Sequence, residues 1–218
     1  MKNKPPLRTI WLARHGARQD SMYPGWRHTA ERPDDTPLAK EGHQQARETG
    51  QFLRQQGGVD VIYTSPFLRA VETAGNVAEI LDVPIRIEPG LCEVLNPDWF
   101  QTKPECLSPA DLAERYPWIE LHYVPRVHPT YPEYEARGDV NERCRKTVHA
   151  LLEDTWERSL WVGHGASVGG VAWALTGHTE HVCCQLCGLT GWKGTPNHWQ
   201  PIYSGVDHLS ITEDTLKG

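Results

Sequence analysis

Short apolar runs alternate with longer amphipathic stretches along most of the chain. Four short runs, rich in β-branched and aromatic residues, are typical of buried strands: 8–13, 59–63, 84–87 and 160–162. Between and after them, apolar residues recur every three or four positions, which predicts helices at 40–56, 65–81, 140–156 and 167–175. Strands that alternate with helices indicate an α/β fold, with a mostly parallel central sheet and helices on both faces.

The ends of these elements carry further signals. Ser65-Pro66 is typical of an N-cap followed by a first-turn proline, and Ser167 is expected to cap the helix that it begins. Three more strands are expected near the C-terminus, around 185–192, 200–203 and 208–211.

Two segments interrupt the alternation. Residues 19–37 are expected to form a long polar loop. A loop of this length more often lines a functional site than simply connects two elements. Residues 94–138 hold seven of the 17 prolines and seven of the 19 aromatic residues. Because disordered linkers contain few aromatic residues, we expect a packed insertion with a short helix near 109–115, lying over the functional site. The whole chain, 1–218, is expected to form one domain that contains this insertion.

Charged and nucleophilic side chains follow the ends of four predicted strands. They are Arg14, His15 and Arg18 after the first strand, Arg69 after the second, Glu93 after the third and His164 after the fourth. Ligands of parallel sheets bind beyond the carboxyl ends of the strands, so we expect these side chains to meet at one edge. An unprotonated histidine nitrogen can attack phosphorus, and guanidinium groups can hold phosphate oxygens. This arrangement favours phosphoryl transfer to His15.

These positions also carry a resemblance to the histidine phosphatase superfamily, which includes phosphoglycerate mutase-like enzymes. Its motifs here are Arg14-His15-Gly16, Ser65-Pro66 with Arg69 and Thr73, and Gly163-His164-Gly165. The chain is most similar to the branch of steroid-phosphate and tyrosine-phosphate phosphatases, whose Arg-His-Gly-x-Arg and Glu-Pro-Gly-Leu-x-Glu patterns match residues 14–18 and 88–93. The resemblance implies a phosphoglycerate mutase-like fold and the hydrolysis of phosphomonoesters.

The resemblance also implies roles for individual residues. His15 is expected to be the nucleophile that becomes phosphohistidine, and Glu93 the proton donor. The phosphate is expected to be bound by Arg14, Arg18, Arg69 and His164. No cofactor or metal is expected for this chemistry, and the substrate is expected to be a phosphorylated small molecule or a phosphotyrosine.

Three other functions compete with this one. A phosphoglycerate mutase-type phosphotransferase is disfavoured, because Ala17 and the run 19–22 replace a Glu or Gln and a later Asn that such mutases commonly carry. Residues 165–169 read Gly-x-Ser-x-Gly, the nucleophile elbow of serine hydrolases at Ser167, but the later acid and histidine that such enzymes need are poorly matched. A zinc-stabilised binding protein is the third alternative, with the ligand set His178, His181, Cys184 and Cys187.

The amino-acid composition excludes some classes of binding partner and of cellular location. The net charge of −6 argues against a nucleic-acid or anionic-membrane surface, so a phosphate site must be a local positive pocket. Residues 1–8 lack the apolar core of a signal peptide, no apolar run reaches membrane-spanning length, and six irregularly spaced cysteines do not form a disulfide pattern. A cytoplasmic location is expected. The oligomeric state is left open, a homodimer included.

Overall fold

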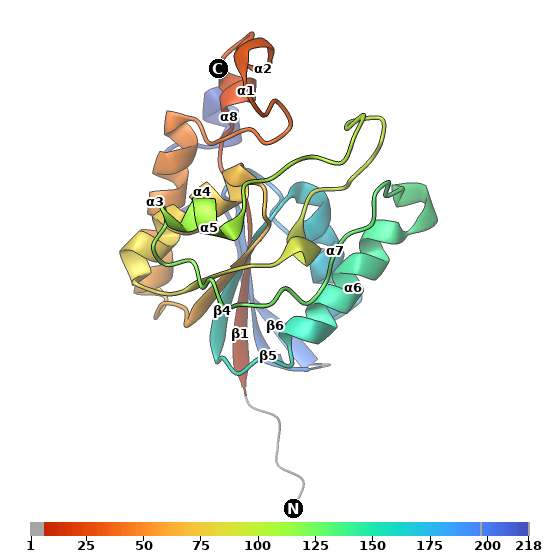
Figure 1. Ribbon diagram of the computed structural model, residues 1–218. Coiled ribbons are helices and arrows are strands. Elements are labelled where there is room, and N and C mark those ends of the chain that lie inside the picture. Colours follow the sequence, from red (N-terminus) through yellow and green to blue (C-terminus); the bar gives the residue numbers. More distant parts are fainter. Residues whose placement is uncertain (1–6, 197, 218) are drawn as a thin grey trace, which may run out of the picture.

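The computed structural model describes residues 7–196 and 198–217 (Figure 1). Within them the central sheet has six strands in the order β3-β2-β4-β1-β5-β6. Their bounds are β1 (Arg8–Arg14), β2 (Val61–Thr64), β3 (Ile85–Ile87), β4 (Arg158–Gly163), β5 (Leu189–Thr195) and β6 (His198–Gly205). The first four strands are parallel, whereas β5 is antiparallel to β1 and to its neighbour β6. The predicted mostly parallel sheet is confirmed.

Helices cover both faces of this sheet, also as predicted. The longer ones are α3 (Lys40–Gln55), α4 (Leu68–Leu81), α6 (Asp139–Leu151) and α7 (Gly165–Thr176). The shorter ones are α1 (Gln19–Met22), α2 (Trp26–Thr29), α5 (Pro109–Ala113) and α8 (Glu213–Leu216), with 3₁₀ turns η1 (Pro89–Leu91) and η2 (Glu135–Arg137). A membrane-crossing helix would need a longer apolar stretch than any helix in the described part of the chain provides.

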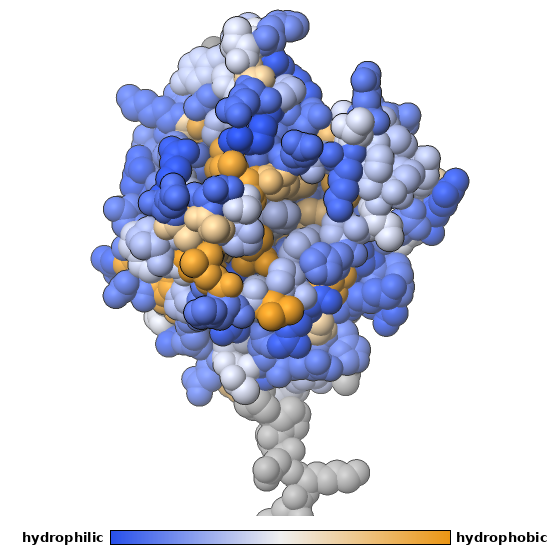
Figure 2. All heavy atoms as spheres, in the orientation of Figure 1, coloured by the Kyte–Doolittle hydropathy of each residue, from blue (hydrophilic) through white to orange (hydrophobic). Residues whose placement is uncertain are grey.

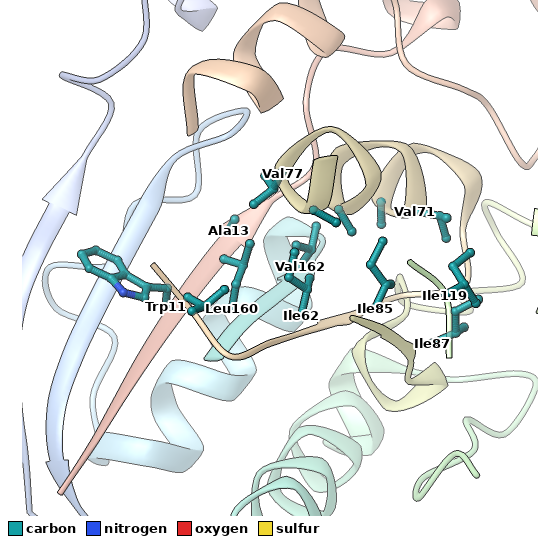
Figure 3. Packing of buried hydrophobic residues seen from close by; sticks show 14 of the residues in the cluster. Trp11, Ala13, Ile62, Val71, Val77, Ile85, Ile87, Ile119, Leu160 and Val162 are labelled. Atoms are coloured by element: carbon teal, nitrogen blue, oxygen red, sulfur yellow. The ribbon is translucent and has the colours of Figure 1, made fainter. Parts of the chain in front are cut away.

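Alternate residues of each central strand enter two separate cores. Trp11 and Ala13 of β1 pack with α3 and α4 on one face, while Ile10 and Leu12 pack with α6 and α7 on the other. Figure 3 shows Val71 and Val77 of α4 on the same side of the sheet as Ala13. Because both faces of β1 are buried, its sequence is continuously apolar rather than alternating, which is the pattern that predicted the strand.

The insertion at 94–138 is packed, as expected. It crosses in front of the sheet in Figure 1, and Figure 2 shows hydrophobic residues near the centre of that face within a mostly hydrophilic surface. Leu112 and Ile119 of the insertion join the core beneath α4, and Ile119 forms a bridge with Ile85 of β3. Nearer the strand ends, Leu95 and Phe100 pack around Phe67.

Several expected element boundaries were wrong. Ser65 does not cap α4: Phe67 occupies the N-cap position, and the Leu68 N–H donates to Asp35 Oδ1 at 2.7 Å instead. Likewise His164 is the N-cap of α7, and Ser167 is the third residue of the helix. In α4 a side chain distant in sequence takes the role expected of a local hydroxyl, whereas in α7 the Ser167 hydroxyl still accepts from the His164 N–H at 2.8 Å, from within the first turn.

The remaining corrections concern element lengths. Helix α6 ends at Leu151, so Trp156 packs against the core from outside the helix. Strand β5 begins only at Leu189, and residues 208–211 form turns and bends rather than a strand. The expected loop at 19–37 contains the short helices α1 and α2.

Two glycines bring the loop after β1 against the start of α3. A Cβ atom on Gly16 would lie 2.8 Å from the Gly42 carbonyl oxygen, and one on Gly42 would overlap the Ala17 carbonyl group. Two hydrogen bonds also join this loop to α3 and its N-cap. The Ala17 N–H donates to Gln45 Oε1 at 2.9 Å, and the Ala17 carbonyl accepts from the Ala39 N–H at 2.8 Å. The backbone next to His15 is therefore fixed by a contact that leaves no room for a side chain.

The Gly42→Ala substitution is expected to destabilise the protein, because the added methyl group must push the 16–18 backbone away from α3. We expect the free energy of unfolding, measured by urea denaturation, to fall by ~1–3 kcal/mol. Gly169→Ala in α7 is the matched control, since a Cβ there meets no atom within 4 Å. The control should be neutral or more stable by ~0.5–1 kcal/mol, and an equal loss in both variants would contradict this account of Gly42.

Candidate active site

His15 stands at the end of β1, buried in the rim of the sheet. Its backbone N–H donates to the Gly163 carbonyl at 3.0 Å, and its ring Nδ1 lies 2.8 Å from the Gly16 carbonyl oxygen. A carbonyl oxygen can only accept, so Nδ1 carries the proton and Nε2 keeps a free lone pair. Burial first, and then the charge of Arg69, lower the pKa of His15 well below 6.5. The imidazole is therefore neutral at neutral pH.

The second histidine, His164, follows β4 and faces the first, with 5.2 Å between the two ring centroids. Its Nε2 is 2.8 Å from the Ser65 hydroxyl, which can donate to it and so leave the ring proton on Nδ1. That Nδ1 is buried, has no hydrogen-bond partner among the described residues, and lies 3.5 Å from Glu93 Oε2. Burial and the charge of Arg69 lower the pKa of His164 as well.

Two arginines bring positive charge to this pair of rings. Arg69, in the first turn of α4, is buried with its guanidinium 4.6 Å from the centre of the Phe67 ring. Burial lowers the pKa of Arg69 to about 10, which leaves it a cation at neutral pH. Arg14 donates from Nη1 to the Cys184 carbonyl at 2.9 Å and pairs with Glu213 of α8 at 3.2 Å. In both arginines Nε is buried and lacks a partner among the described residues.

Glu93 comes from the segment after η1, and its side chain is 17% exposed. Its Oε2 lies 3.8 Å from Arg69 Nη2, and its Oε1 accepts from the Val94 N–H at 3.0 Å. Arg18 is more exposed and pairs with Asp20 at 3.0 Å. The structure thus brings the strand-end residues predicted from the sequence to one edge of the sheet.

Two clefts meet at Arg18. The first, of about 310 Å³, is lined by Arg14 and His15 and by the apolar side chains of Met22, Leu186 and Leu216. The second, of about 240 Å³, is lined by Arg69 and Glu93 together with Asp20, Asp34, Trp99 and Phe100. The nucleophile candidate and the proton-donor candidate therefore open into different clefts, and a group bound between them can reach both.

Three contributors were not predicted as site residues. Ser65 was expected to cap a helix but contacts His164. Asp35, in the loop before α3, holds the first turn of α4 beside Arg69. Glu213, near the C-terminus, pairs with Arg14 and accepts from the Leu186 N–H at 2.8 Å. No local pattern marks Asp35 or Glu213, because each acts on a residue far away in the sequence.

The geometry disfavours the other two chemistries. Ser167 is 1% exposed, and its hydroxyl bonds the backbone of His164, accepting from the N–H at 2.8 Å and donating to the carbonyl at 3.2 Å. It is not an accessible nucleophile. Across residues 7–196 and 198–217, no three or more His, Cys, Asp or Glu side chains come together as metal ligands would, so His178, His181, Cys184 and Cys187 are not gathered into a zinc site.

The chain belongs to the histidine phosphatase superfamily (branch 1), whose family model matches residues 10–200. It is 28% identical over 207 residues to the ecdysteroid-phosphate phosphatase of Bombyx mori, covering 77% of this chain and 30% of that protein. It is 29% identical over 174 residues to the probable phosphoglycerate mutase GpmB of Yersinia enterocolitica, covering 79% and 76%.

Solved structures share the fold. The crystal structure of the ecdysone phosphate phosphatase from Bombyx mori, in complex with tungstate, superposes with a TM-score of 0.75 at 22% identity, covering 90% of this chain and 92% of that one. The chain spans less than a third of the full length of the first curated relatives, from 22% to 30%. The likeness therefore concerns only a part of those longer proteins.

The lowered pKa of His164 links stability to pH. Between the folded pKa and the ordinary value of 6.5, the unfolded chain binds more protons than the folded one, so stability falls as pH falls. His164→Gln removes this contribution. We expect the stability difference between wild type and variant to shrink from about pH 7 to about pH 5, by at most about 1.4 kcal/mol per pH unit. Urea denaturation at several pH values measures it, and parallel pH curves would show that His164 is not held neutral.

Proposed function

We propose that this chain is a phosphomonoester hydrolase in which His15 carries the phosphoryl group between two displacement steps. The observation that carries the proposal is the hydrogen bond between His15 Nδ1 and the Gly16 carbonyl, because it leaves Nε2 unprotonated in a pocket of positive charge. A phosphohistidine intermediate is general to the superfamily to which the chain belongs. Phosphoryl transfer needs mainly positioning and neutralisation of the equatorial oxygens, and the site has the groups for both.

In the first step, His15 Nε2 attacks phosphorus and the bond from phosphorus to the ester oxygen breaks. Glu93, in its protonated form, gives its proton to the departing alkoxide, so the alcohol leaves neutral. Arg14, Arg18 and Arg69 balance the charge of the phosphate oxygens. The Nδ1–H of His164, which has no hydrogen-bond partner among the described residues, donates to one of these oxygens. His15 becomes phosphohistidine, with its ring positively charged.

In the second step, water takes the place of the alcohol. The Glu93 carboxylate removes a proton from water as its oxygen attacks phosphorus, and the bond between phosphorus and Nε2 breaks. Inorganic phosphate leaves, His15 is again neutral, and Glu93 is again protonated. One carboxyl group thus serves as acid and then as base, which requires it to reach the same face of the phosphorus in both steps.

The second cleft supports a substrate with a ring-shaped leaving group. Glu93 opens into this cleft, so the alcohol leaves through it, and the half-exposed Trp99 offers a flat apolar surface there. Asp20 and Asp34 line the same cleft, but Arg27 lines it too and pairs with them at 3.6 and 2.6 Å, so their charges are balanced there. Hydrolysis rather than mutase activity is favoured by Ala17 and the run 19–22, which replace residues that such mutases commonly carry. A phosphorylated ring alcohol or a phosphotyrosine fits this chemistry.

His15→Ala is expected to abolish the release of phosphate from p-nitrophenyl phosphate, because the second histidine at the rim, His164, has its Nε2 bonded to the Ser65 hydroxyl and its proton on Nδ1. We expect kcat to fall by at least about 10⁴-fold, down to the activity that binding and charge alone provide. The matched control is His149→Ala in α6, where the side chain is 75% exposed and lines neither of the two clefts. The control should keep the wild-type rate.

Three results would contradict the proposal. They are substantial turnover by His15→Ala, labelling of Ser167 by an organophosphonate with loss of activity, and a wild-type protein that isomerises phosphoglycerates faster than it releases phosphate.

A further inference from the structure

The segment that carries Glu93 has no strand or long helix to hold it. Its backbone carbonyl groups instead converge on one guanidinium, that of Arg143 in α6. Arg143 Nη1 donates to the carbonyl oxygens of Gly90 at 2.7 Å and Cys92 at 3.1 Å, and Nη2 donates to that of Glu93 at 3.4 Å. A planar fork of five N–H donors can bind several acceptors at fixed angles, which a lysine cannot do.

Glu133, near the end of the insertion, completes the arrangement. Its carboxylate accepts from Arg143 Nε at 2.7 Å and from Nη2 at 3.0 Å. The same carboxylate accepts from the Leu95 N–H at 3.2 Å, while the backbone N–H of Glu133 donates to the Leu95 carbonyl at 2.9 Å. Together the two side chains hold the backbone on both sides of Glu93. We call this pair, Arg143 and Glu133, the Glu93 clamp.

The clamp is enclosed in the protein and lies apart from the substrate space. The side chains of Arg143 and Glu133 are 4% and 2% exposed, and neither lines the two clefts at the active site. All five N–H donors of Arg143 have acceptors, so none is left for a phosphate oxygen. A buried ion pair adds little stability compared with apolar residues of the same volume. The reason for this ion pair therefore lies in the backbone that it holds around Glu93, rather than in the stability that it adds.

We propose that Arg143 and Glu133 are positioning residues that hold the Glu93 carboxyl group at the place where the leaving oxygen departs. The inference rests on the proposed function, in which Glu93 handles the proton of the leaving group. The Glu93 side chain lies within 3.5 Å of His164 Nδ1 and 3.8 Å of Arg69 Nη2, so its carboxyl group has to be held between two donors. Displacement of a catalytic group by about 1 Å costs on the order of 10²-fold in rate.

The test compares two phosphate esters that differ in their need for a proton. The alkoxide of benzyl phosphate needs a proton as it leaves, whereas the p-nitrophenolate of p-nitrophenyl phosphate leaves readily without one. We expect Arg143→Lys to lower kcat/KM for benzyl phosphate on the order of 10²-fold and for p-nitrophenyl phosphate by less than about threefold. Glu93→Gln sets the benchmark and should show the same selectivity more strongly.

Two further variants distinguish a loss of positioning from a general folding defect. Arg143→Met combined with Glu133→Gln removes the clamp without leaving a buried charge unpaired, and it should show the same selective loss. Arg8→Lys is the matched control, because Arg8 also holds two carbonyl groups, those of Leu152 at 2.6 Å and Asp154 at 2.9 Å, but at the opposite end of β1. Its ratio of kcat/KM values for the two esters should equal that of wild type.

Equal losses on both esters in Arg143→Lys and in the double variant, or no loss in either, would overturn the positioning role while Glu93→Gln remains selective and the proposed function stands. If wild type hydrolyses neither ester, the proposed function fails and the inference fails with it.

Discussion

The chemistry of this site depends on the hydrogen bond between His15 Nδ1 and the carbonyl group of the next residue, Gly16. It fixes the tautomer of a ring that burial keeps neutral, and so it leaves Nε2 as the nitrogen with a free lone pair. The Gly16 carbonyl is itself held, because the Gly16 N–H donates to Thr73 at 3.1 Å and Gly16 packs directly on Gly42. Helices α3 and α4 therefore orient the imidazole, although neither contributes its nucleophilic atom.

Two arginine side chains place positive charge around that ring. Arg69 and Arg14 are buried or half-buried, and each has a buried Nε without a partner among the described residues. Burying these N–H donors without an acceptor is unfavourable, and this supports the proposal that an anion binds here. Its carboxylates are Glu93 at the second cleft, Asp35 at the start of α4, and Glu213, which pairs with Arg14 and lines the first cleft.

Much of this could be predicted from the sequence, because strand ends in a parallel sheet meet at one edge. The continuous apolar runs of β1 and β4 predicted the central strands, and the residues that follow them predicted His15, Arg14 and His164 as site residues. The sequence could not predict contacts between distant segments. The Ser65 hydroxyl bonds His164, 99 positions away, and Arg143 reaches Glu93 from a helix that was predicted only for its apolar face. Such partners are chosen by tertiary packing, which local propensity does not record.

The central claim is that Nε2 of His15 accepts the phosphoryl group because Nδ1 is held as the proton-bearing atom. The most direct measurement is nitrogen and phosphorus NMR of protein labelled at histidine and quenched during turnover of a phosphomonoester. One phosphohistidine is expected, at position 15, with phosphorus bonded to Nε2. A phosphoryl group on Nδ1, on His164 or on a residue other than histidine would contradict it.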